Sequence, residues 1–383
     1  MRLARGLLVL AAVAVAAGCS KEEDVEPPAE LVDFNATLAV KREWSLRAGA
    51  DEVLRLGLSP VVDGERVLVA GAEGEVFALN LANGRSAWRA RLDTRLSAGP
   101  GAGEGLVAVG TPKGEVIALD AADGAERWRV KVAGEVLARP AVGGGRVIVH
   151  TTDGRLTALD AADGRSLWTF EQPVPRLSVR GSAAPVVDGD AVFAAFDNGK
   201  VAALTLAEGD LLWTATVATP SGRTELQRLV DIDAPVKVAG DDVFVAGFQG
   251  RAAMIARGTG QIWWGREYST YRGIALDDEA LYLSTAEGTV VSLSRRDGTE
   301  RWRQDVLIRR GLSGPAVDGD AVVVADFEGY LHWLDRGSGE LAGRVSTDGK
   351  RISNAPVAAG GLVIAQTDAG GVYALRATPR AAR

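Results

Sequence analysis

The chain has 383 residues, a formal net charge of −7 and a single cysteine. An acidic chain without a basic cluster argues against nucleic acid as a partner, and one cysteine excludes an internal disulfide. Glycine is frequent, at 47 residues, which is typical of a fold with many tight turns.

The first eighteen residues predict a cleaved export signal. Two arginines precede an apolar run from Gly6 to Ala17, which is short for a membrane span and has the flanks of a signal peptide. The run ends in Ala-Ala-Gly-Cys and resembles a bacterial lipobox, which implies cleavage before Cys19 and acylation of this residue. Ser20 in the next position resembles the outer-membrane sorting pattern. The alternatives are an ordinary signal peptide or a buried free thiol.

Residues 19–40 are expected to form the acylated cysteine and a flexible tether. Lys21 to Glu30 is charged, contains prolines and has no apolar periodicity, as is typical of segments that do not pack.

A unit of about forty residues recurs over residues 41–377. Residues 138–168 show it most clearly, with three short apolar runs and the start of a fourth, separated by Asp-Gly turns that favour hairpins. The unit opens on a proline at Pro60, Pro100, Pro140, Pro185, Pro235, Pro315 and Pro356, and a degenerate copy at Tyr271 lacks the proline. It closes on a tryptophan four residues after a glycine, at Trp88, Trp128, Trp168, Trp213, Trp264 and Trp302. Eight such copies predict an all-β fold, an eight-bladed β-propeller of four-stranded antiparallel blades.

The two chain ends are predicted to meet in the last blade. The eighth copy stops after Gly371–Leu375 without its tryptophan strand, and the missing strand is found at the other end, around Trp44. Closure by this N-terminal strand would remove the free edges of the ring. Gly343 stands where the seventh copy should have its tryptophan, so one docking contact is expected to be absent. Residues 378–383 are expected to be a tail.

No catalytic or metal-binding set is predicted. His150 and His332 are the only histidines and lie in separate strand runs, where packed side chains are expected. No serine lies in a Gly-x-Ser-x-Gly elbow. The acidic turns at Leu119–Gly124 and Leu159–Gly164 lack the further ligands of a calcium loop, and hairpin chemistry explains them.

The same turn, with tryptophan four residues after its glycine, resembles the tryptophan-docking repeat of quinoprotein dehydrogenases, which bind pyrroloquinoline quinone. This resemblance implies an enzyme as an alternative. Members of that family are usually longer and carry a vicinal disulfide, a calcium site and a catalytic aspartate. This chain cannot form the disulfide and shows no matching cluster, so no cofactor is expected.

Two consecutive connections are longer than the repeat requires. The intervals from Trp168 to Trp213 and from Trp213 to Trp264 are 45 and 51 residues, and long loops on a rigid scaffold often carry binding functions. Both follow the tryptophan strand, so they are expected side by side on one face. The candidate binding residues are Leu177, Val179 and Arg180 in the first loop and Asp231 and Asp233 in the second. Their alternation predicts exposed segments that present one row of side chains to a protein; the alternative is that Arg180 and the aspartates bridge the two loops.

The acylated leader, Leu31–Phe34, Trp44 and the eight repeats together resemble the BamB family, lipoproteins of the outer-membrane β-barrel assembly machinery. The most specific segments are Leu177–Ser182, Thr224–Asp233 and Glu328–Trp333. Val179 stands where the family often has leucine.

This resemblance implies a non-catalytic scaffold, anchored through Cys19 at the periplasmic face of the outer membrane, that assists β-barrel protein folding and insertion. It also implies that the five candidate residues contact the POTRA domains of the BamA barrel protein within the BAM complex. Direct binding of unfolded outer-membrane proteins is left open. The remaining alternatives are a quinoprotein dehydrogenase that uses pyrroloquinoline quinone, and a lipoprotein propeller that binds another envelope protein.

Overall fold

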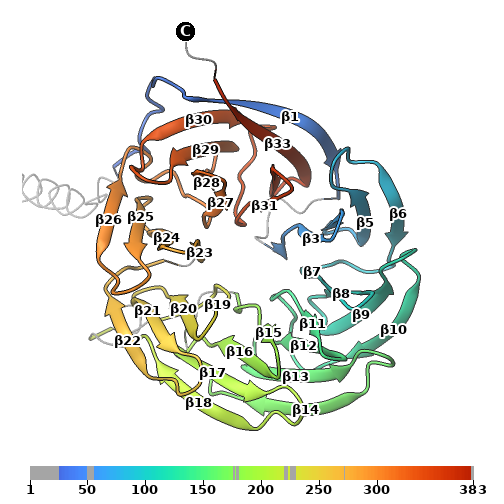
Figure 1. Ribbon diagram of the computed structural model, residues 1–383. Coiled ribbons are helices and arrows are strands. Elements are labelled where there is room, and N and C mark those ends of the chain that lie inside the picture. The colour runs from blue at the N-terminus through green and yellow to red at the C-terminus, as the bar shows by residue number, and fades with distance from the viewer. Residues whose placement is uncertain are drawn as a thin grey trace, which may run out of the picture.

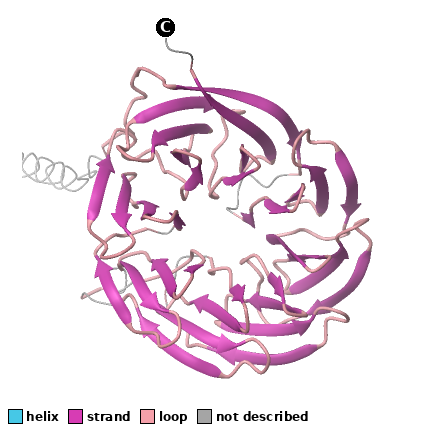
Figure 2. Ribbon diagram, viewed as in Figure 1, coloured by secondary structure: helices cyan, strands magenta, loops and turns pink. Residues whose placement is uncertain are grey.

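Eight small sheets form a closed ring (Figure 1). The computed structural model describes residues 26–49, 56–175, 177, 181–219, 223–224, 230–270 and 272–380. Within these residues, strands joined by turns and loops make up the whole structure (Figure 2), and no helix is long and apolar enough to cross a membrane. The predicted eight-bladed propeller is therefore confirmed.

Seven blades are built from four consecutive strands each, and the eighth combines both ends of the chain. Blade 1 comprises β3 (Val61–Asp63), β4 (Arg66–Ala70), β5 (Glu75–Asn80) and β6 (Ser86–Arg91), and blade 2 comprises β7 (Ala98–Gly103), β8 (Leu106–Gly110), β9 (Glu115–Asp120) and β10 (Glu126–Lys131). Blade 3 comprises β11 (Ala141–Gly143), β12 (Arg146–His150), β13 (Arg155–Asp160) and β14 (Ser166–Glu171), and blade 4 comprises β15 (Val186–Asp188), β16 (Ala191–Ala195), β17 (Lys200–Thr205) and β18 (Leu211–Thr216). Blade 5 comprises β19 (Lys237–Ala239), β20 (Asp242–Ala246), β21 (Ala252–Ala256) and β22 (Ile262–Arg266), and blade 6 comprises β23 (Ile274–Leu276), β24 (Ala280–Ser284), β25 (Val290–Ser294) and β26 (Glu300–Gln304). Blade 7 comprises β27 (Ala316–Asp318), β28 (Ala321–Ala325), β29 (Tyr330–Asp335) and β30 (Leu341–Ser346), and blade 8 comprises β31 (Val357–Ala359), β32 (Leu362–Gln366), β33 (Gly371–Pro379) and β1 (Leu38–Arg47). A short strand, β2 (Gly57–Leu58), adds to β7 in parallel.

The hydrophobic core lies between the blades. The second and third strands of each blade are apolar on both faces, because each sheet is covered by a neighbour on either side. In β12, for example, Val147, Ile148 and Val149 are fully buried. The buried side chains form eight clusters, each shared by two adjacent blades. The apolar contacts between neighbouring blades therefore hold the ring together.

The tryptophan on the outer strand docks on the next blade. The indole of Trp128 donates its Nε1–H to the carbonyl of Ala161 at 2.9 Å. Its ring lies against Gly164, where an added Cβ would be 2.8 Å from the indole. Seven tryptophans make this hydrogen bond: Trp44, Trp88, Trp128, Trp168, Trp213, Trp264 and Trp302. In blades 1 to 7 the turn glycine thus receives the tryptophan of the preceding blade.

The last blade is closed by the N-terminal strand, as predicted. β1 pairs antiparallel with β33, from Leu38 opposite Pro379 to Arg47 opposite Gly371, and the two lie together in Figure 1. The pairing begins three residues before the expected start at residue 41 and uses two residues of the expected tail.

This closure also explains Gly343. Because β33 and β1 come from opposite ends of the chain, no turn joins them, and blade 8 lacks the turn glycine on which a tryptophan would dock. The space at Gly343 is filled instead by Leu38 and Val40 of β1.

The described part of the N-terminal tether is held against the ring. Arg309 donates to the carbonyl of Pro27 at 2.8 Å, Arg310 to that of Ala29 at 2.9 Å, and Arg344 to that of Val32 at 3.1 Å. The sequence predicted a flexible tether over residues 19–40, but in its described part three backbone carbonyls between Pro27 and Val32 are fixed by arginines of blades 6 and 7, and residues 38–40 belong to β1.

Candidate partner-binding site

The two long connections lie beside each other, as predicted. One joins β14 to β15 and the other joins β18 to β19. A Cβ added to Gly181 in the first would be 2.6 Å from Oδ1 of Asp233 in the second. Leu177 is 43% exposed, a large value for a leucine side chain, whereas Val179 and Arg180 lie outside the described residues.

Asp231 and Asp233 do not form an exposed row. Asp231 is fully buried, and its backbone forms a bridge with Phe248, whose N–H donates to the Asp231 carbonyl at 2.7 Å. Asp233 is only partly exposed. The alternating pattern was correct for a strand-like segment, but the bridge to blade 5 turns the Asp231 side chain inward.

A third carboxylate, which the sequence did not single out, completes this site. Asp197 lies in the turn between β16 and β17, and it brings one oxygen within 4.8 Å of oxygens from Asp231 and Asp233. In the described part of the chain this is the one group of three acidic, histidine or cysteine side chains that lie so close together. Aspartate in a hairpin turn is ordinary, so no local signal distinguishes Asp197 from the other turn aspartates.

The crowding of these carboxylates changes their protonation. Burial, together with the charge of Asp197, raises the pKa of Asp233 to about 7, although Arg272 acts in the opposite direction. Oδ1 of Asp233 is buried, and no described residue donates a hydrogen bond to it. The cluster can therefore hold a proton at neutral pH or accept a cation, either a basic side chain or a hard metal ion that prefers oxygen ligands.

Both histidines have packing roles. His150 hydrogen-bonds through Nδ1 to the carbonyl of Ala183 at 2.8 Å and packs on the ring of Phe196. Burial lowers the pKa of His150 and His332, which favours neutral rings.

His332 belongs to the set of side chains that fixes the N-terminal segment. Its Nε2–H donates to Asp326 at 3.1 Å, and its Nδ1 accepts from Arg344 at 3.2 Å. Asp326 also pairs with Arg310 at 2.7 Å, and Arg310 contacts Glu328. Side chains in and next to Glu328–Trp333 therefore orient Arg310 and Arg344, two of the three arginines that bind the tether carbonyls.

Comparison with known proteins agrees with this architecture. A family model described as outer membrane protein assembly factor BamB matches residues 29–95, 73–304 and 286–380. The factor of that name from Pseudomonas aeruginosa is 47% identical over 90% of this chain and 92% of its own length. The one from Marinobacter adhaerens is 51% identical over 93% of this chain and 92% of its own length.

Solved structures show the same fold. The crystal structure of BamB from Moraxella catarrhalis superposes with a TM-score of 0.81 at 28% identity and covers 88% of this chain and 100% of that one. A quinohemoprotein alcohol dehydrogenase from Comamonas testosteroni reaches a TM-score of 0.69 at 14% identity, over 88% of this chain and 76% of that one. This second likeness is one of fold alone. With the ring, its tryptophan docking and its N-terminal closure in place, the family match over nearly the whole propeller shows that the chain belongs to the family of outer membrane protein assembly factor BamB.

Proposed function

We propose that this protein is a non-catalytic scaffold of the outer-membrane protein assembly machinery, anchored by an acylated Cys19 at the periplasmic face of the outer membrane. Its membership of the BamB family carries this proposal, since relatives that match over most of the chain are named outer membrane protein assembly factors. Its partner is the periplasmic POTRA region of the barrel protein BamA, as the sequence resemblance implies, and its role is to assist β-barrel folding and insertion.

The two neighbouring loops are the proposed contact surface. Leu177 supplies an exposed apolar side chain on the first loop, and such a residue gains most when a partner covers it. Val179 and Arg180 extend the same loop in the sequence.

The carboxylate cluster contributes in a different way. Asp231 is buried, so it acts by orienting the second loop, whereas Asp233 is partly exposed and its pKa is raised by burial and by the charge of Asp197. A basic side chain of the partner placed near Asp233 would relieve the repulsion between the carboxylates. Such binding favours the ionised form of Asp233, and it should therefore strengthen as the pH rises through 7.

Co-purification of the barrel protein with tagged variants of this chain tests the proposal. Leu177→Glu is expected to weaken capture at least tenfold, because it places a charge in the apolar contact. Leu212→Glu is the matched control, since Leu212 is 55% exposed but lies at the start of the outer strand β18, whose other end leads into the second loop. The double change Asp231→Asn with Asp233→Asn should also weaken capture.

Thermal unfolding of each variant shows whether its ring is intact. Full capture by a folded Leu177→Glu variant, or equal loss with Leu212→Glu, would contradict the assignment of the partner surface to these loops.

A further inference from the structure

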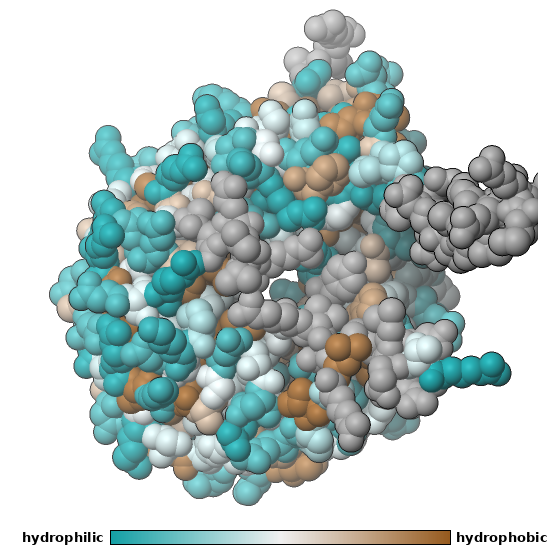
Figure 3. Space-filling model, turned by 180° about the vertical axis from the view of Figure 1, so that it is seen from behind, coloured by the Kyte–Doolittle hydropathy of each residue, from teal (hydrophilic) through white to brown (hydrophobic). Residues whose placement is uncertain are grey.

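A cavity of about 720 Å³ lies at the centre of the ring, lined by the inner strands and the loops that lead into them. Figure 3 shows the central opening from one face of the molecule. The volume lies within the range of sites that hold small molecules. Most of the lining is small or apolar, so the charged residues among it are conspicuous.

Arg139 breaks the repeat at a position that lines this cavity. It is the residue directly before the proline that opens a repeat. The same position in the other repeats that have this proline holds only small residues: Ser59, Gly99, Ala184, Ala234, Gly314 and Ala355. A long cationic side chain is therefore not required there by the fold.

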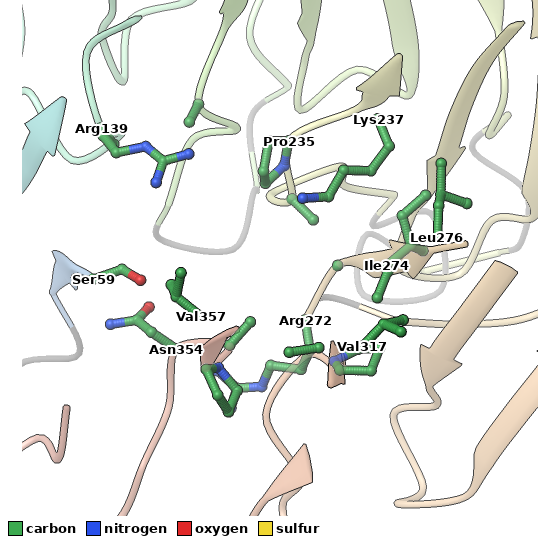
Figure 4. Close-up of a pocket in the computed structure, with 18 of the residues that line it drawn as sticks. Ser59, Arg139, Pro235, Lys237, Arg272, Ile274, Leu276, Val317, Asn354 and Val357 are labelled. Carbon is green, nitrogen blue, oxygen red and sulfur yellow. The ribbon is translucent and has the colours of Figure 1, made fainter. Parts of the chain in front are cut away.

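Lys237 breaks the repeat in a second position. It pairs with the third residue of the next strand, as one residue of the innermost strand does in every blade. The equivalent residues of the other blades are all small or β-branched: Val61, Gly101, Ala141, Val186, Ala275, Ala316 and Val357. Figure 4 shows the Arg139 guanidinium and the Lys237 side chain extending into the same cavity.

Neither of the two cations has a hydrogen-bond or ion-pair partner within the part of the chain that the structure describes. Burial lowers the pKa of Arg139, and crowding by neighbouring atoms together with the charge of Arg139 lowers the pKa of Lys237, whose side chain is still exposed. Two like charges that share one cavity repel each other, and a bound anion would relieve this repulsion.

The acidic residues of the lining are engaged elsewhere. Asp277 accepts a hydrogen bond from the Tyr282 hydroxyl at 2.7 Å and faces Arg336 at 3.5 Å. Asp233 is paired electrostatically with Arg272, and its raised pKa of about 7 leaves it partly protonated. Asp278 is exposed to solvent.

We infer that the central cavity binds a small anion with several carboxylate or phosphate oxygens, held by Arg139 and Lys237. The guanidinium can bind two oxygens of one such group in parallel, while the ammonium acts as a point charge. The Ser59 and Asn354 side chains lie across the cavity from Arg139 (Figure 4). Nδ2 of Asn354 already donates to the carbonyls of Leu56 and Leu58, so the two cations remain the main binding groups for the anion. The two cations are not among the residues of the partner-binding loops proposed above, although Asp233 of the second loop also lines the cavity.

Calorimetric titration of the purified full-length protein with pyrophosphate and with citrate tests the inference. Arg139→Ala and Lys237→Val introduce residues that other blades hold in the equivalent positions, so the ring should tolerate them. Lys131→Ala is the matched control, because it removes a positive charge from the exposed end of the outer strand β10. We expect one anion to bind per chain, at least tenfold more weakly in each single variant and undetectably in the double variant, with Lys131→Ala unchanged.

A thermal shift gives a second readout, because a ligand that binds the native state raises the melting temperature. Pyrophosphate or citrate should raise it for the unaltered protein but not for the double variant, and sodium chloride at equal ionic strength should not reproduce the effect. A stronger response to pyrophosphate would assign a phosphate ligand, and a stronger response to citrate a carboxylate. Absence of binding by both probes, or equal binding by the double variant, would overturn the inference.

Discussion

At the scale of single residues, Asp233 shows how the fold changes a side chain that the sequence can identify but not characterise. Its position in an unusually long connection marks it as a candidate. Its raised pKa depends first on burial beside the bridge between Asp231 and Phe248, and then on the charge of Asp197, which lies 36 residues earlier. Neither the distant carboxylate nor the bridge is visible in a local pattern.

The protonation of Asp233 predicts a pH-dependent effect of Asp233→Asn on stability. The pKa of Asp233 rises from its ordinary value of 3.8 to about 7 in the folded chain. Between these values the folded state binds a proton that the unfolded state has lost, so the free energy of unfolding falls as the pH rises. Asp233→Asn removes this loss, so it should raise the melting temperature most at pH 8 and progressively less as the pH falls toward 5.

Thermal melts at several pH values between 5 and 8 test this prediction. Asp190→Asn, at an exposed turn, serves as a control for the loss of one negative charge. Melting curves of Asp233→Asn that stay parallel to those of the unaltered protein across this range would show that Asp233 does not titrate there.

At the scale of elements, the sequence repeat predicted the four strands of each blade and the place of the tryptophan on the last of them. Both are local patterns with a fixed spacing. The glycine before each tryptophan was seen only as a turn residue. The structure shows that it receives the indole of the preceding blade, a contact between residues more than thirty positions apart. The sequence predicted that one docking contact is missing at Gly343. The physical reason for this became visible only in the structure, which shows how blade 8 is closed.

Two glycines in blade 2 separate this docking contact from ordinary turn strain. Gly105 and Gly124 have φ angles of 77° and 78°, so alanine meets the same left-handed backbone at each, at a cost of about 1–2 kcal/mol. A Cβ at Gly105 has no neighbour within 4 Å, whereas one at Gly124 would be 2.6 Å from the indole of Trp88. Gly124→Ala should therefore destabilise the protein by about 1–3 kcal/mol more than Gly105→Ala.

Urea unfolding followed by tryptophan fluorescence measures this difference. Equal effects of the two substitutions would mean that the tryptophan moves away at no cost. The interface between blades 1 and 2 would then depend on its aliphatic side chains alone.

At the scale of the whole molecule, the number of blades and the place of closure followed from counting repeats, since every copy must have four strands. The course of the N-terminal tether did not follow, because Glu26–Phe34 has no periodicity and is held by arginines far along the chain, through backbone carbonyls, the Glu26 carboxylate and the Phe34 ring. The backbone carbonyls carry no sequence signal, and the side-chain partners are not adjacent in sequence. The central cations could be found from the aligned repeats, but only once the structure showed which positions line the cavity.

The closure predicts that β1 can be moved along the chain but not removed. Deletion of residues 38–47 should leave the edge of β33 unpaired and the docking site for Trp44 at Gly84 empty. Exposed edge strands promote aggregation, so this variant should melt at a lower temperature and associate.

In a second variant the same ten residues follow Pro379 through a short turn. Because Leu38 lies opposite Pro379 in an antiparallel pair, this arrangement makes blade 8 a continuous four-stranded unit like the other seven. Size-exclusion chromatography and thermal melts should show recovery of a monodisperse ring. Failure of the moved strand to restore stability would show that β1 must be connected to blade 1 in order to close the ring.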